Sequence, residues 1–70
     1  MNKQEIILYT KSGCPKCKVL EKELKTNGIS YNEITDINHM IELGLREVPV
    51  LSVNGKLLRY SDAISYIRGE

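Results

Sequence analysis

The two cysteines of the chain constrain its fold more than any other feature, because they lie between a strand-like run and a helix-like pattern. Cys14 and Cys17 are the only cysteines among 70 residues, and they enclose Pro15 and Lys16. A cysteine at a helix N-terminus lies near the positive end of the helix dipole and near unpaired backbone N–H groups. Both favour the thiolate, which is the reactive form of cysteine. The placement therefore predicts a strand–loop–helix unit that carries a redox-active thiol pair.

Four short segments have the apolar patterns of β-strands. The apolar run within residues 5–9 is typical of a strand buried on both faces, and residues 29–34 alternate apolar and polar side chains. Residues 50–53 and 56–59 flank Asn54-Gly55, the dipeptide that most strongly favours a tight hairpin. The sequence therefore predicts four strands, of which the last two are antiparallel.

Three helical segments connect or follow these strands. Asn27-Gly28 is predicted to end the first helix, Asp36 to cap a second that ends near Gly44, and Ser61 to cap the third. The predicted apolar faces are Cys17, Leu20 and Leu24, then Ile37, Met40 and Ile41, and finally Ile64 and Ile67. The order β-α-β-α-β-β-α predicts an α/β fold in which helices flank one mixed four-stranded sheet.

Composition excludes several other classes of protein. Basic and acidic residues nearly balance, with a net charge of +1, so nothing points to a nucleic-acid or membrane-surface binder. No apolar run approaches the length of a membrane span, and no signal peptide is apparent at the start of the chain. Two cysteines are too few for a secreted disulfide scaffold. We therefore expect one small cytoplasmic domain over residues 1–70, a monomer that binds neither nucleic acid nor membrane.

Three parts of the sequence carry a family resemblance. Residues 9–17, which read YTKSGCPKC, precede a helical pattern; Val48-Pro49 opens a strand; and Asn54-Gly55 is followed by Ser61-Asp62. Together these motifs resemble the glutaredoxin family, including its small relatives that supply ribonucleotide reductase with electrons. The resemblance covers nearly the whole chain. It implies the minimal thioredoxin-like fold, with a cis peptide bond between Val48 and Pro49.

The two cysteines have separate predicted roles in dithiol–disulfide exchange. Cys14 is the predicted nucleophile, whose thiolate attacks a substrate disulfide to give a mixed disulfide. Cys17 is the predicted resolving thiol, and burial on the apolar helix face would keep its pKa high. The alternatives are a buried or incidental thiol for Cys14 and a purely structural role for Cys17. The resulting activity is that of a thiol–disulfide oxidoreductase that needs no metal or organic cofactor, with glutathione as the candidate co-substrate.

Five further residues are candidates for contacts with the substrate or with glutathione: Lys11, Lys16, Val48, Pro49 and Asp62. The resemblance places Lys11 opposite the active cysteine, while Lys16 is a cation that would favour the Cys14 thiolate. It also implies that Val48 presents its backbone to a bound substrate chain as a short β-bridge. The alternatives are a solvated loop charge for Lys11 and an ordinary acid in the first helical turn for Asp62.

Three departures from the family pattern bear on the source of electrons. Glu47 replaces a threonine, Lys16 replaces an aromatic residue, and Arg59-Tyr60 replaces the Gly-Gly pair that lets glutathione approach the backbone in glutaredoxins. Two reductants therefore remain candidates: glutathione, or a flavoenzyme similar to thioredoxin reductase. In both cases the predicted substrates are proteins that carry disulfides.

A third hypothesis is a non-catalytic module that binds a metal or a partner protein. A CxxC pair supplies half of a tetrahedral zinc site, which needs four ligands. Beyond Cys14 and Cys17, His39 is the remaining candidate ligand, and it falls on a different predicted helix. A zinc site within one chain is therefore not expected, whereas a site shared by two chains stays open.

Overall fold

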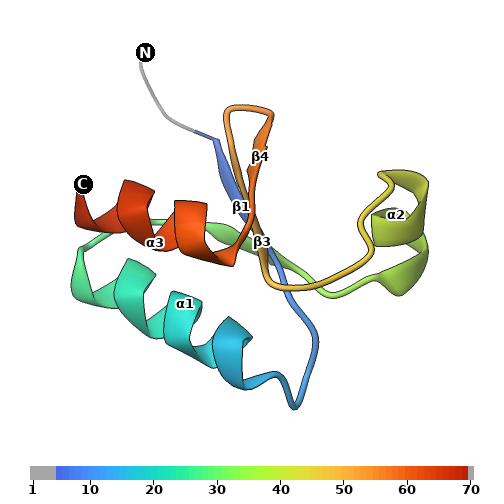
Figure 1. Ribbon diagram of the computed structural model, residues 1–70, viewed down its shortest axis with the longest axis horizontal. Helices are drawn as coiled ribbons and strands as arrows, with labels where there is room; N and C mark the ends of the chain where they lie inside the picture. The colour runs from blue at the N-terminus through green and yellow to red at the C-terminus, as the bar shows by residue number, and fades with distance from the viewer. Residues whose placement is uncertain (1–4, 70) are drawn as a thin grey trace.

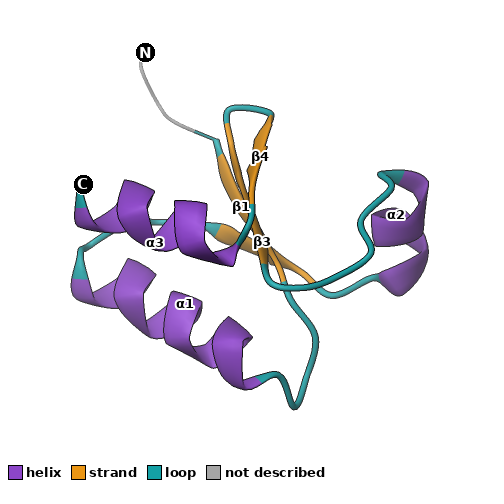
Figure 2. Ribbon diagram, viewed as in Figure 1, coloured by secondary structure: helices purple, strands orange, loops and turns teal. Residues whose placement is uncertain are grey.

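The computed structural model describes residues 5–69, which form one four-stranded sheet with helices against both of its faces (Figures 1 and 2). Along the chain the elements are β1 (Ile6–Tyr9), α1 (Pro15–Thr26), β2 (Asn32–Ile34), α2 (Ile37–Glu42), β3 (Val50–Val53), β4 (Lys56–Leu58) and α3 (Tyr60–Arg68). The strands lie in the order β2-β1-β3-β4; β1 is parallel to β2 and antiparallel to β3, and β3 is antiparallel to β4. The predicted α/β fold and its order of elements are confirmed.

Three strands are shorter than predicted. β1 excludes residue 5, β4 excludes residue 59, and β2 begins at Asn32 instead of Ile29. The register explains the last difference, because pairing with β1 starts where Asn32 lies opposite Ile7, after Ile29 and Tyr31. Both of these side chains are partly buried against the main core. The apolar–polar alternation before residue 32 therefore reflects burial without strand pairing.

The main core lies between the sheet and the helix pair α1 and α3, which pack side by side on one face (Figure 1). Leu8 of β1 and Leu51 of β3 are fully buried there, together with Leu20 and Leu24 of α1. Cys17 continues the buried face of α1, which confirms the prediction for this helix. Fully burying one leucine is worth about 1.5–3 kcal/mol. This core therefore fixes the position of α1 and of the cysteines at its N-terminal end.

The third helix begins earlier than predicted, so the assignment of Ser61 as its cap is wrong. Arg59 is the N-cap residue, and no side chain caps this end of α3. Because a single residue joins β4 to α3, Ser61 falls inside the first turn, as does Asp62. Ile67 is buried and Ile64 packs partly buried against the core, which confirms the inward face of the helix.

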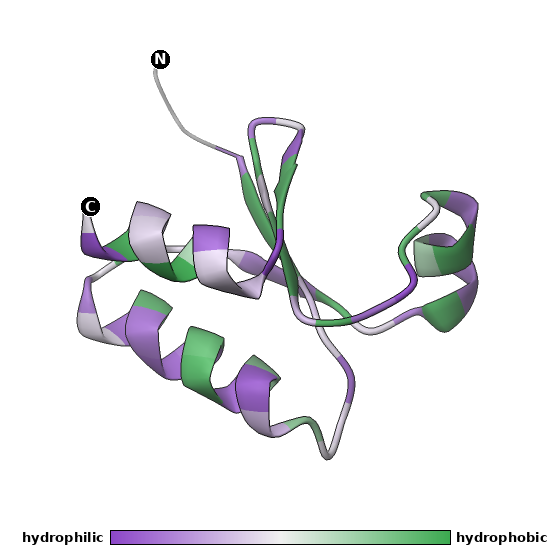
Figure 3. Ribbon diagram, viewed as in Figure 1, coloured by the Kyte–Doolittle hydropathy of each residue, from purple (hydrophilic) through white to green (hydrophobic). Residues whose placement is uncertain are grey.

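The second helix covers only part of the opposite sheet face. Asp36 caps α2 as predicted, since its carboxylate accepts from the backbone N–H groups of Asn38 and His39 at 3.0 and 3.3 Å. Met40 packs against Tyr9 and Val50 of the sheet. The side chains of Ile37 and Ile41 are 59% and 65% exposed, so Met40 is the one residue of the predicted apolar face that is buried. Six residues make fewer than two turns, and such a helix presents little of its surface to the sheet. Figure 3 shows the resulting apolar colour on α2, away from the other helices.

The hairpin between β3 and β4 forms at the predicted dipeptide. Asn54 and Gly55 both have positive φ values, 52° and 90°, as the tight turn favoured by Asn-Gly requires. Asn54 also binds Glu5 twice: its N–H donates to the Glu5 carbonyl at 2.9 Å, and its Oδ1 accepts from the Glu5 N–H at 2.8 Å. The turn is thereby tied to the start of β1.

Within residues 5–69, every helix is too short or too polar to span a lipid bilayer.

Candidate active site

Cys14 caps the N-terminus of α1 with its sulfur atom. Its backbone is extended, with φ −97° and ψ 113°, and its Sγ accepts from the backbone N–H of Cys17 at 3.2 Å. The Cys14 carbonyl accepts the first helical hydrogen bond, from Lys18 N–H at 3.2 Å, and Pro15 follows at a position that tolerates proline. The Cys14 sulfur therefore serves as the capping group that serine or aspartate provides in other helices.

The surroundings of Cys14 lower the pKa of its thiol below the ordinary value. The largest cause is a hydrogen bond from the Cys17 side chain, followed among the favourable causes by the backbone N–H groups of Cys17 and Lys16. The Lys11 ammonium adds an electrostatic contribution, while partial burial acts in the opposite direction. All the favourable contacts stabilise negative charge on the sulfur. At neutral pH, the thiolate fraction of Cys14 is therefore larger than that of an isolated cysteine.

The pKa of Cys17 is shifted in the opposite direction. The Cys17 side chain is 1% exposed, and burial is the largest cause of its raised pKa; donation of its thiol proton to Cys14 is the next. The Thr10 hydroxyl and the Lys11 backbone N–H oppose the shift. Thr10 directly follows β1 and is buried beside this thiol. The pair therefore consists of one accessible cysteine whose ionised form is favoured and one buried cysteine whose ionised form is disfavoured.

The contact between Thr10 and Cys17 gives a testable prediction. Thr10→Val removes the hydroxyl while nearly keeping the shape, so the pKa of Cys17 should rise further and a smaller fraction of it should be thiolate near neutral pH. The mixed disulfide on Cys14 should therefore last longer in Thr10→Val than in the unmodified protein, and the two lifetimes should differ less at alkaline pH. Quenched-flow mass spectrometry measures these lifetimes. Thr10→Ser keeps the hydroxyl and should behave like the unmodified protein. If the mixed disulfide lasted equally long in Thr10→Val and Thr10→Ser at all pH values, the hydroxyl would not act on Cys17.

A groove of about 530 Å³ opens beside Cys14. It brings together three predicted site residues, Lys11, Cys14 and Val48. The other lining residues come from α2 and the segment that follows it: Ile37, Met40, Ile41, Leu45, Arg46 and Glu47. Sequence reasoning did not place these side chains at the site. The apolar residues in and after α2 could have indicated this surface, because a helix of six residues is too short to bury all of them.

A second hollow, of about 260 Å³, shares Glu47 and Val48 with this groove. It is lined by Lys16, Glu47, Val48, Pro49, Arg59, Tyr60 and Ser61. The peptide bond between Val48 and Pro49 is cis, as predicted, and Pro49 is buried. The Lys16 ammonium lies 5.4 Å from the centre of the Tyr60 ring. Lys16 lowers the pKa of Cys14 through its backbone N–H.

Two predicted site residues stand apart from these hollows. Asp62 is exposed in the first turn of α3 and lines neither of them. His39 lies on α2, where its ring stacks on that of Tyr9, with 6.1 Å between centroids and 26° between planes. Among residues 5–69, no group of three or more His, Cys, Asp and Glu side chains is arranged to hold a metal ion. The geometry therefore places no third ligand beside the two cysteines within this part of the chain.

Solved structures with this fold include two of very different length. The first is a Nu-class GST from Haemonchus contortus, with a TM-score of 0.78 and 18% identity; the match covers 96% of this chain and 36% of that one. The chain thus spans about a third of the transferase. The second is a mutant of the thioredoxin-like protein BC3987, with a TM-score of 0.69 and 21% identity, covering 84% and 82% of the two chains. These similarities confirm the predicted thioredoxin-like fold.

Sequence comparisons identify the family. A curated relative, the glutaredoxin-like protein NrdH of Lactococcus lactis subsp. cremoris, is 32% identical over 53 residues, which cover 67% of this chain and 74% of the relative. The profile of the glutaredoxin family matches residues 6–58, from β1 to the end of β4 and including both cysteines. The chain belongs to the glutaredoxin family.

Proposed function

We propose that the protein is a dithiol–disulfide oxidoreductase that reduces disulfides in other proteins through Cys14 and Cys17. The observation that carries this proposal is the Cys14 sulfur, which caps α1 on the Cys17 N–H and borders an open groove. Membership of the glutaredoxin family supports the same reaction class. We further propose that residues 1–70 act as one cytoplasmic, monomeric domain without a resident metal or organic cofactor.

The first step is attack by Cys14 on a substrate disulfide. The Cys14 thiolate forms a bond to one substrate sulfur, the substrate S–S bond breaks, and the other sulfur leaves as a thiolate that takes a proton from solvent. Hydrogen bonds from Cys17 and from backbone N–H groups favour the ionised form of Cys14 before this attack. Its partial exposure lets the substrate sulfur reach it. The product is a mixed disulfide between the protein and its substrate.

The second step is resolution by Cys17. Once Cys14 is bonded to the substrate it carries no charge, so the hydrogen bond that held the proton on Cys17 is lost. Cys17 then loses its proton, and its thiolate attacks the Cys14 sulfur. A Cys14–Cys17 disulfide forms, the bond to the substrate breaks, and the second substrate sulfur leaves as a thiolate. The substrate gains two electrons, and the protein loses the same two.

The predicted binding residues have separate roles in this proposal. Lys11 and Val48 border the Cys14 groove, where the ammonium would attract an anionic substrate and the Val48 backbone would pair with an extended chain. Lys16 and Pro49 border the neighbouring hollow and would contact the same chain on its other side. Asp62 lies outside both hollows. We propose that it complements the dipole of α3 and meets only a ligand that extends beyond these surfaces.

We infer that the electrons come from a flavoenzyme similar to thioredoxin reductase. Arg59 and Tyr60 border the hollow next to Val48 at the positions where glutaredoxins have two glycines, and the Lys16 ammonium lies over the Tyr60 ring. The side chains of Arg59 and Tyr60 would occupy the space that glutathione, a tripeptide, needs in order to approach the backbone. A protein reductase would meet the chain through a larger surface, so its binding would not depend on this hollow.

Two coupled assays with an insulin disulfide substrate test this function and its reductant. One supplies electrons from NADPH through glutathione reductase and glutathione, and the other from NADPH through thioredoxin reductase. We expect sustained turnover with thioredoxin reductase and a rate at least about tenfold lower with glutathione, since a loss of this size corresponds to roughly 1.4 kcal/mol of binding. Equal rates would contradict the assignment of the reductant. The absence of turnover in both assays and with a chemical dithiol would contradict the oxidoreductase function itself.

A further inference from the structure

The face of the sheet opposite α1 and α3 remains open near its edge strand. α2 covers this face around Tyr9 and Val50, through Met40. Beyond that contact, Ser52 of β3 pairs with Leu57 of β4, and Leu57 is 46% exposed. β4 is an edge strand of the sheet, so Leu57 lies at the border of this face.

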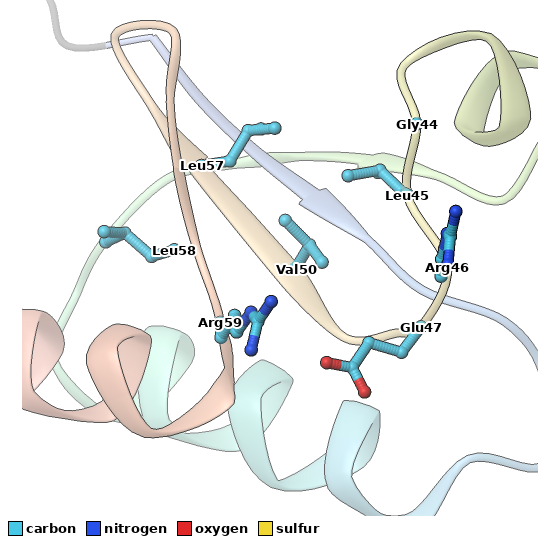
Figure 4. A pocket seen from close by; sticks show the side chains of 8 residues that line it. All are labelled: Gly44, Leu45, Arg46, Glu47, Val50, Leu57, Leu58 and Arg59. Atoms are coloured by element: carbon cyan, nitrogen blue, oxygen red, sulfur yellow. The ribbon is translucent and has the colours of Figure 1, made fainter.

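A groove of about 640 Å³ lies between this edge and the segment 44–47 (Figure 4). Leu57 and Leu45 point toward each other across it, with Val50 between them, so its floor is apolar. At the other end, the side chains of Arg59 and Glu47 extend toward each other from opposite sides. The groove therefore combines an apolar floor with a charged end, as sites that bind an extended peptide do.

This groove at β4 adjoins the groove beside Cys14. Leu45, Arg46 and Glu47 line both of them. Glu47 also lines the small hollow at Lys16, so all three hollows meet around one short segment. A polypeptide whose disulfide lies at Cys14 would thus be led past this segment toward Leu57.

The charge around these hollows differs from that of the whole chain. The chain carries a net charge of only +1. Four basic side chains line the three hollows, against the single carboxylate of Glu47; they are Lys11, Lys16, Arg46 and Arg59. The ion pair seen within residues 5–69 joins Arg68 to Glu23 at the far ends of α3 and α1. The positive charge of the active-site face is therefore available to a negatively charged partner.

We propose that the groove at β4 binds an extended segment of the protein substrate that carries acidic residues next to an apolar one. The apolar side chain fits between Leu45 and Leu57, and the carboxylates fit Arg46 and Arg59. This inference rests on the proposed oxidoreductase function and names the class of substrate that the site selects. Selection acts mainly on the rate of association, because charges at the rim of an interface steer the encounter.

Two synthetic peptides test the proposal directly. Both contain the same internal disulfide and the same extension of about eight residues, which spans about 27 Å when extended and so matches the 29 Å length of the protein. In one peptide the extension places a leucine among glutamates, and in the other among lysines. The rate constant for reduction by the dithiol protein is measured for each in a single turnover, with hydroxyethyl disulfide as a small reference substrate.

We expect the acidic peptide to be reduced at least about tenfold faster than the basic one at low ionic strength, with the ratio falling as salt is added. Arg59→Glu should bring this ratio close to one, and Leu57→Ser should slow reduction of the acidic peptide relative to the small disulfide. Lys25→Glu is the matched control: it changes the net charge equally but lies at the C-terminal end of α1, outside the three hollows. It should leave most of the ratio intact.

Two results would overturn the docking site while leaving the oxidoreductase function in place. One is equal reduction of both peptides, and the other is a loss of selectivity in Lys25→Glu as large as in Arg59→Glu. Failure to reduce either peptide or the small disulfide would instead overturn the function and the inference together. Circular dichroism melts of each variant confirm that the rates compare folded proteins.

Discussion

Replacing Cys14 with serine is expected to lower the rate of disulfide reduction by at least about a thousandfold. The thiolate at this position is the attacking atom, and a serine hydroxyl stays protonated near neutral pH. Serine is a good N-cap residue, so it can accept the same Cys17 N–H that the sulfur accepts at 3.2 Å. The helix should therefore stay intact while the nucleophile is lost. Turnover of insulin disulfides, followed by NADPH consumption, measures the change.

The control for this variant separates chemistry from folding. Cys14→Ser and the unmodified protein should have similar free energies of unfolding in urea, because both keep a capping group at the start of α1. A variant that retains a substantial part of the reductase activity would show that Cys14 is not the nucleophile. If Cys14→Ser lost both its activity and its structure, Cys14→Asp and Cys14→Ala would be tested in its place. Aspartate is a strong N-cap residue and alanine is a weak one, so the two variants separate the effect of the cap from the loss of the thiol.

Replacing Cys17 with serine is expected to stop the reaction after its first half. Cys14 can still attack a protein disulfide, but no thiol on the chain remains to release the substrate, so the mixed disulfide accumulates. Intact-mass spectrometry under non-reducing conditions should detect one covalent adduct per chain. Addition of a small dithiol should release it. The rate of reduction by the protein alone should fall by at least about a thousandfold, as for the loss of an essential nucleophile.

The double variant Cys14→Ser/Cys17→Ser serves as the matched control, because it should form no adduct at all. An adduct on Cys17 in the Cys14→Ser variant, formed as fast as the adduct on Cys14 in the Cys17→Ser variant, would contradict the assigned roles. The structure argues against that outcome. Cys17 is 1% exposed, whereas Cys14 borders an open groove.

Much of the site could be predicted from the sequence because its central part is local. A thiol at a helix N-terminus, a second thiol one turn later and an apolar helix face depend on residues that are close in the chain, from Cys14 to Leu24. The Asn54-Gly55 turn is equally local, since both residues must adopt positive φ values. Such features follow from short-range geometry, and the structure confirms them.

The features that could not be predicted depend on contacts between distant segments. The start of β2 depends on where β1 begins to pair with it, opposite Asn32, and not on the alternation that begins at Ile29. Whether Ile37 and Ile41 are buried depends on how much of the sheet α2 reaches. Likewise, Arg46 borders the Cys14 groove only because the segment after α2 passes beside the start of α1. Periodicity along the chain carries no information about these distances.

The proposed chemistry depends most directly on the opposite pKa shifts of the two cysteines. Alkylation of the reduced protein by iodoacetamide, followed over a range of pH with mass spectrometry to resolve each site, measures both shifts. The alkylation rate of a thiol rises with pH as its thiolate forms. Cys14, whose pKa is lowered by its hydrogen bonds and by Lys11, should react first, with its midpoint below that of a free cysteine. Cys17, whose pKa burial raises, should react only at higher pH. Equal midpoints, or a lower midpoint at Cys17, would contradict the assignment of Cys14 as nucleophile and Cys17 as resolving thiol.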